Sequence, residues 1–144
     1  MPVLSDDLVI VREDAVLPGP RSIDLRPDAA ARIPGSEDIG YVGRRHRHRI
    51  ALPEVPARAR LAGIVTLAWV AQGDIEVTPL NFKGRLRALT ANGVLARLGP
   101  PPASLLFEAA CLPGYLLSRP RSWDHHERVI DVAMEISGAR PMYS

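Results

Sequence analysis

The chain has 144 residues, of which 47% are hydrophobic and 24% are charged, so it is long enough for a folded domain with its own core, and general disorder is excluded. Its formal net charge of +2 excludes a strong overall attraction to nucleic acid, because the field of so small a charge is weak. The longest apolar run, residues 61–71, is too short to span a bilayer.

The first forty residues predict short strands. Residues 8–13 are rich in β-branched side chains, which favours a strand, and a second extended piece precedes a proline–glycine turn at residues 18–20. Residues 21–26 alternate polar and apolar side chains, as a half-buried strand does. Pro27 then opens a short helical segment, because proline fits the first position of a helix.

Three further strands are predicted in the middle of the chain. Residues 61–70 are almost wholly apolar, which is typical of a strand covered on both faces, and we expect this strand at the centre of the sheet. Residues 75–80 follow across a short glycine turn as the returning strand. Residues 41–52 predict an exposed strand or one arm of a hairpin.

The remainder of the chain predicts helices. An apolar stripe at helical spacing runs through residues 82–98, and a second helix is expected at residues 103–112. A last helix begins near Asp124, which forms a capping-box pattern with Glu127, and ends at Gly138 in a left-handed conformation.

These elements predict an α/β fold in a single domain over residues 1–144. Strands occupy about residues 1–80 and form a mixed sheet, and the mainly helical part, about residues 81–144, covers it.

The chain has one cysteine, Cys111, within an apolar helical stretch. One cysteine excludes an internal disulfide and fits a reducing compartment, and we expect a buried thiol without a catalytic role. No signal-peptide pattern opens the chain. The expected location is therefore cytoplasmic.

Two adjacent carboxylates, Asp6 and Asp7, directly precede the first strand. Such a pair suits the chemistry of a magnesium nucleotide, in which a hard cation takes oxygen ligands and one carboxylate accepts a proton from the attacking hydroxyl. Taken alone, the pair also fits a solvated strand edge that limits aggregation. A glycine-rich phosphate loop is missing from the sequence, whose only lysine is Lys83.

A basic segment at residues 44–49 alternates arginine and histidine. As a strand it places His46 and His48 on one face and Arg45, Arg47 and Arg49 on the other. This arrangement permits a metal site, an anion patch for phosphate or an acidic protein, or a solvated basic hairpin. The sequence leaves these alternatives open.

An ordered set of segments resembles the C-terminal half of the HPr kinase/phosphorylase family, in particular its shorter HPr kinase-like relatives. The resemblance rests on the acidic pair Asp6-Asp7 between two strands, on an apolar strand ending near Trp69, and on the Gly84-Arg85 step of a basic loop that enters a helix. The matching segments are residues 4–9, 18–27, 61–69, 78–85 and 112–123. The resemblance implies part of a phosphate-loop domain whose fold is akin to that of phosphoenolpyruvate carboxykinase. Members of the family phosphorylate a serine of a carrier protein with ATP and Mg²⁺.

By this resemblance Asp6 or Asp7 would hold Mg²⁺ while its neighbour takes the proton, both acting as catalytic residues. Lys83 and Arg85 would contact phosphate at a predicted helix N-terminus, where backbone N–H groups favour anions. Because the phosphate loop is absent, we expect an inactive or weakly active kinase portion that binds ATP poorly unless an upstream segment or another chain supplies that loop.

The alternative function is a non-catalytic binding module that uses the basic strand at residues 44–49. The expected partners are a carrier protein or a second copy of the chain, because an incomplete sheet would leave an apolar edge uncovered. We expect neither nucleic acid nor a membrane as a partner.

Overall fold

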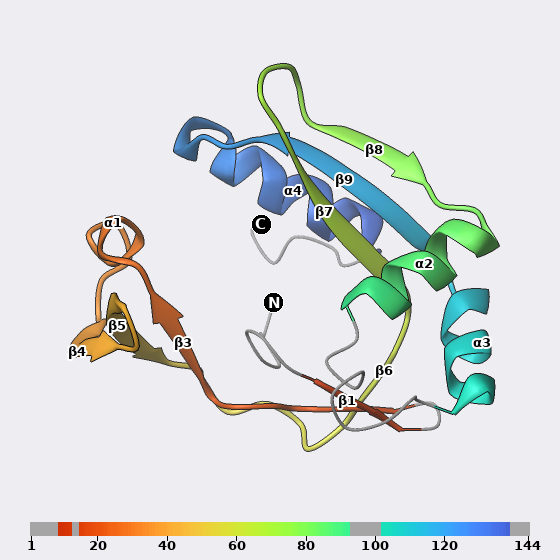
Figure 1. The fold of residues 1–144 in the computed structure, drawn as a ribbon, viewed down its shortest axis with the longest axis horizontal. Coiled ribbons are helices and arrows are strands. Elements are labelled where there is room, and N and C mark those ends of the chain that lie inside the picture. The colour runs from red at the N-terminus through yellow and green to blue at the C-terminus, as the bar shows by residue number, and fades with distance from the viewer. Residues whose placement is uncertain (1–8, 13–14, 93–101, 139–144) are drawn as a thin grey trace. The chain divides into compact units, whose positions relative to one another are not determined.

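The computed structural model describes residues 9–12, 15–92 and 102–138. Within these ranges the chain has an α/β fold with four α-helices and three small sheets, so the predicted class is confirmed (Figure 1). The chain divides into two compact units, Met1–Leu61 and Ala62–Ser144. Among the described residues, no helix is long and apolar enough to cross a membrane.

In its described residues, the first unit contains two three-stranded antiparallel sheets. One has the strand order β1-β2-β6, and its strands are β1 (Ile10–Arg12), β2 (Ala15–Leu17) and β6 (Ala59–Arg60). Strands β1 and β2 lie where the sequence predicts the first strand and the extended piece that follows it. Val16 is buried in this sheet, with 6% of its surface exposed.

The second sheet of this unit has the order β3-β5-β4, so the basic strand is central. Its strands are β3 (Ser22–Leu25), β4 (Glu37–Val42) and β5 (Arg45–Ala51). A two-residue turn at Gly43 and Arg44 joins β4 to β5, and the positive φ of Gly43, 64°, suits such a hairpin. The predicted helical turn is α1 (Pro27–Ala30), which follows β3 directly.

The second unit is built on a mixed sheet of the order β7-β9-β8. Its strands are β7 (Ile64–Val70), β8 (Glu76–Pro79) and β9 (Gly114–Pro120). Strand β9 runs parallel to β7 and antiparallel to β8. The helical segments between β8 and β9 therefore belong to a crossover connection, which parallel neighbours require.

Three predictions about this sheet are wrong. Strand β7 lies at the edge and not at the centre, and β8 pairs with β9 instead of returning beside β7. The strands also do not end near residue 80, because β9 lies within the mainly helical part. The apolar run that suggested a central strand is instead one whose side chains alternate between half-buried and exposed.

The helices of the second unit are α2 (Phe82–Asn92), α3 (Ala103–Cys111) and α4 (His126–Ile136), with a short 3₁₀ turn at Trp123–His125. Helix α4 supplies the core by packing Val129 and Val132 on Leu117 of β9, which is 1% exposed. Residues 93–98 of the helix predicted at residues 82–98 lie outside the described residues.

Two local details of these helices differ from expectation. The predicted capping box of Asp124 and Glu127 is wrong, because α4 follows His125 without a side-chain cap. Ser122 instead caps the preceding 3₁₀ turn, since its hydroxyl oxygen accepts a hydrogen bond from the backbone N–H of Asp124 at 3.2 Å. Cys111 is exposed at the end of α3, so the expected burial of its thiol is wrong. The left-handed exit at Gly138 is confirmed by its φ of 66°.

An apolar face of β7 is exposed. The register places Leu67 beside Leu117 and Trp69 beside Arg119, so these side chains share the face on which α4 packs. Leu117 is covered, whereas 59% of Leu67 and 58% of Trp69 are exposed. The guanidinium of Arg119 lies 4.2 Å from the centre of the Trp69 ring, a cation–π contact.

Candidate functional site

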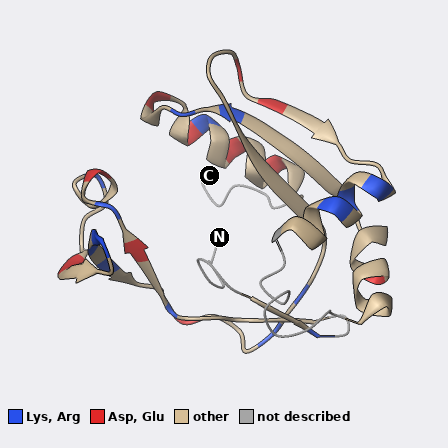
Figure 2. Ribbon diagram, in the orientation of Figure 1, with Lys and Arg blue, Asp and Glu red and all other residues tan. Residues whose placement is uncertain are grey.

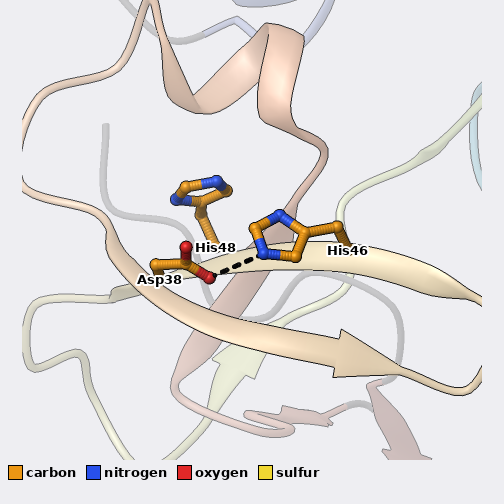
Figure 3. A group of neighbouring side chains, drawn as sticks. All are labelled: Asp38, His46 and His48. Atoms are coloured by element: carbon orange, nitrogen blue, oxygen red, sulfur yellow. Dashed lines mark ion pairs between the residues drawn. The ribbon is translucent and has the colours of Figure 1, made fainter.

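The β4–β5 hairpin brings together three side chains that can bind a metal ion. Strand alternation sends His46 and His48 to the same face of β5, as the sequence predicts. Asp38 on β4 lies directly opposite His48. The carboxylate therefore joins the two imidazoles on one face of the sheet (Figure 3).

A β-bulge determines this position of Asp38. Pairing back from the turn places Tyr41 opposite His46, and regular pairing would then place Asp38 opposite Arg49, on the other face. The register shifts between Asp38 and Gly40, so that Asp38 faces His48 instead. Gly40 has a φ of 70°, a conformation that glycine adopts without strain, and its N–H donates a hydrogen bond to Asp38 Oδ1 at 2.8 Å.

The three side chains are close and only partly covered. His46 Nε2 lies 3.1 Å from Asp38 Oδ1, and one ligand atom from each of the three residues lies within 4.8 Å of the others. The His46 ring packs edge-on against Tyr41 at 5.2 Å and against His48 at 5.3 Å between ring centres. The side chains of His46 and Asp38 are 33% and 56% exposed, so water and ions reach the cluster.

The opposite face of the hairpin holds the arginines, and one of them is already paired. Arg49 lies across from Asp24 and donates two hydrogen bonds to its carboxylate, at 2.7 and 2.9 Å. These hydrogen bonds hold the pKa of Asp24 below its ordinary value, and the charges of Arg49 and Arg47 add to the effect. The guanidinium of Arg49 is thus already paired with Asp24 of the same sheet.

A hollow lies where α1 meets the beginning of β5. It is lined by Arg26, Pro27, Asp28, Arg45 and His46. Two arginines and one histidine therefore line this hollow together with a single acidic residue. Neither Arg26 nor Arg45 has a side-chain hydrogen bond or ion pair with another described residue.

The predicted phosphate contacts, Lys83 and Arg85, lie in the first turn of α2, one of the basic regions of the chain (Figure 2). Lys83 is exposed, and the start of the helix is capped by Asn81, whose Oδ1 accepts the N–H of Gly84 at 2.8 Å. Arg85 is half-buried, and it donates from Nε to the Ala110 carbonyl at 2.7 Å and from NH1 to the Leu80 carbonyl at 2.8 Å. Its guanidinium thus fastens the beginning of α2 to the end of α3.

Asp6 and Asp7 lie outside the described residues. Their predicted role in catalysis and Mg²⁺ binding therefore stays a prediction, as does a phosphate contact of Lys83 and Arg85.

Sequence reasoning missed Asp38 and Arg26. The signal for Asp38 is the Asp-Ile-Gly step at residues 38–40, where a glycine in a strand marks a bulge. The signal for Arg26 is weaker, because its place beside β5 follows only once β3 is paired with that strand.

Comparison of the chain with protein-family models, with curated proteins and with solved structures found no match.

Proposed function

We propose that the first unit is a binding module that holds a phosphate group or an acidic side chain of a partner. The observation that carries this proposal is the hollow in which Arg26, Arg45 and His46 meet. Guanidinium groups present several N–H donors in a planar fork, which suits the oxygens of phosphate and carboxylate.

The charges around the sheet favour the hollow, and not the remainder of the basic strand, as the place where an anion binds. Arg49 donates two hydrogen bonds to Asp24. An incoming anion would therefore have to compete with the Asp24 carboxylate for this guanidinium. Arg26 and Arg45 are exposed and have no such competitor among the described side chains except Asp28, which lines the same hollow. Binding at so open a site is expected to be weak, with a dissociation constant of about 1 mM for a single phosphate group.

The test is calorimetric titration of the chain with phosphoserine. Arg45→Gln and Arg26→Gln should each weaken binding about tenfold, the loss expected for one hydrogen bond to a charged group. Arg58→Gln is the matched control, because it removes the same charge from an exposed position outside the hollow. Equal affinity in all four proteins, or no binding by the unsubstituted chain, would refute the proposal.

The second candidate function is the C-terminal portion of an HPr kinase-like serine kinase. It is favoured by the exposed Lys83 in the first turn of an eleven-residue helix, α2, since a lysine and the positive end of the helix dipole attract phosphate there. The engagement of Arg85 with two carbonyls leaves Lys83 as the cation of this turn that is open to a nucleotide.

Calorimetry with MgATP tests this candidate. The chain alone should bind ATP poorly, because the loop that cradles the phosphates is not in its sequence. A low-micromolar dissociation constant that Lys83→Met abolishes would show a self-sufficient nucleotide site instead. ATP binding that survives Lys83→Met would show that the first turn of α2 does not hold the nucleotide.

A further inference from the structure

We propose that Asp38, His46 and His48 form a binding site for a divalent transition-metal ion, Zn²⁺ being the best suited. The site lies on the β4–β5 hairpin and does not depend on the proposed anion-binding function, although His46 borders both.

The ligand set selects the class of ion. Two imidazole nitrogens and one carboxylate oxygen are typical ligands of Zn²⁺ and of Fe²⁺, Co²⁺ or Ni²⁺. Magnesium and calcium prefer a shell of oxygen atoms, which a single carboxylate does not supply. The hairpin is therefore unlike the acidic pair Asp6-Asp7 and serves a different kind of ion.

The distances are compatible with a common ion. Ligand atoms about 2.0 to 2.2 Å from a tetrahedral Zn²⁺ lie roughly 3.4 Å from each other. His46 Nε2 and Asp38 Oδ1 are 3.1 Å apart, and all three ligand atoms lie within 4.8 Å of one another. Since all three side chains project from the same face of the hairpin (Figure 3), rotation about their side-chain bonds is enough to close the remaining gap.

The surroundings orient the ligands. The backbone N–H of Gly40 donates to Asp38 Oδ1 at 2.8 Å and so holds the carboxylate toward the histidines, in the manner of the hydrogen bonds that support ligands in metal sites. The His46 ring is held between Tyr41 and His48 by edge-on contacts. The β-bulge that creates this arrangement keeps Asp38 away from Arg49, its neighbour under regular pairing.

An ordinary Asp–His ion pair explains only part of this cluster. It accounts for the contact between Asp38 and His46, but it gives no reason for His48 to converge on the same point. The partial exposure of Asp38 and His46 leaves room for water in the remaining coordination positions. Three protein ligands with open positions are typical of sites that exchange a ligand or act on one.

The test is calorimetric titration of the metal-free full chain with Zn²⁺, followed by Co²⁺ and its visible absorption as a direct measure of coordination. One ion should bind per chain. His48→Ala and Asp38→Asn should each weaken Zn²⁺ binding by about tenfold or more, since even the loss of a supporting group costs that much. In Asp38→Asn the amide oxygen still accepts the Gly40 N–H, so the bulge is kept and this variant separates coordination from folding.

His125→Ala is the matched control, because it removes an imidazole of the second unit and should leave the affinity unchanged. Arg26→Gln should also leave Zn²⁺ binding unchanged, which distinguishes failure of the metal site from failure of the anion site. Zn²⁺ binding that is unaltered in His48→Ala and Asp38→Asn, or lost in His125→Ala, would overturn the proposal. Absence of binding by the unsubstituted chain would overturn it as well.

Discussion

The side chain of Arg85 lies against the backbone of Gly114 so closely that a β-carbon at position 114 would fall 2.6 Å from both Cγ and Cδ of the arginine. Gly114 is buried at the start of β9, beside Ile64 of β7. The contact joins the first turn of α2 to the central strand of its sheet. It also restricts residue 114 to glycine.

Gly114→Ala should destabilise the second unit by about 1 to 3 kcal/mol, the usual cost of overpacking. The Arg85 side chain cannot simply move aside, because its guanidinium donates to the carbonyls of Leu80 and Ala110. Urea denaturation measures the effect. Gly73→Ala is not a suitable control, since Gly73 has a positive φ of 118°. Ala68→Gly, on the neighbouring strand, is the better comparison, and an unchanged stability in Gly114→Ala would contradict the packing described.

Arg85→Lys should lower the free energy of unfolding by about 1 to 3 kcal/mol, because an ammonium group cannot reach two carbonyls in the fork geometry of a guanidinium. Arg87→Lys is the matched control on an exposed position of the same helix and should have little effect. Equal unfolding curves for the two variants would mean that the two hydrogen bonds of Arg85 contribute nothing. Arg85 would then be available for a role at the helix N-terminus.

The Asp24–Arg49 pair should give a small, pH-dependent contribution to stability. The hydrogen bonds from Arg49 lower the pKa of Asp24 below its ordinary value of 3.8, so the folded state favours the ionised carboxylate. The contribution is therefore present above the unfolded pKa and is lost as the pH falls through the folded pKa.

Arg49→Gln should raise the pKa of Asp24 toward its ordinary value, as measured by NMR titration of the Asp24 carboxyl. The stability difference between the unsubstituted chain and Arg49→Gln should be constant near neutral pH and shrink below about pH 4. Added salt should reduce it, because both side chains are partly exposed. Arg58→Gln should leave the Asp24 titration unchanged. Identical Asp24 titrations with and without Arg49 would show that the pair does not form in solution.

The exposed face of β7 predicts self-association. Val65, Leu67 and Trp69 expose 41%, 59% and 58% of their surface along an edge strand, and apolar edge strands favour pairing with another copy. Light scattering at increasing concentration should detect oligomers, and Leu67→Glu should reduce them. Ile130→Glu is the control and should leave the association unchanged, since Ile130 is 48% exposed on helix α4 and does not belong to a strand edge. A chain that stays monomeric at all concentrations would contradict this prediction.

Local sequence patterns predict most of the individual elements. Alternation and β-branched residues place β1, β3 and β5, and the apolar stripes place α2, α3 and α4 close to their observed positions. These patterns depend on a few neighbouring residues, which is why they can be recognised without the fold. Strand β9 was missed because its short apolar run, between Gly114 and Pro120, lies between two helical patterns in a part of the chain that is mainly helical.

Pairing between elements could not be predicted in the same way. The place of β7 at the edge follows from the insertion of β9 between β7 and β8, a contact between residues about fifty positions apart. The candidate metal site shows the same difficulty on a smaller scale. Without the bulge next to Gly40, Asp38 would oppose Arg49, and Ile39 would lie opposite His48 in its place.

The most direct test of the proposed anion site is a two-dimensional amide NMR titration of the metal-free chain with inorganic phosphate. The account predicts that the largest shifts lie at Arg26, Asp28, Arg45 and His46, the residues with an amide N–H that line the hollow, and that Arg45→Gln reduces them. Shifts concentrated at residues 82–85 of α2, or none at the hollow, would contradict it.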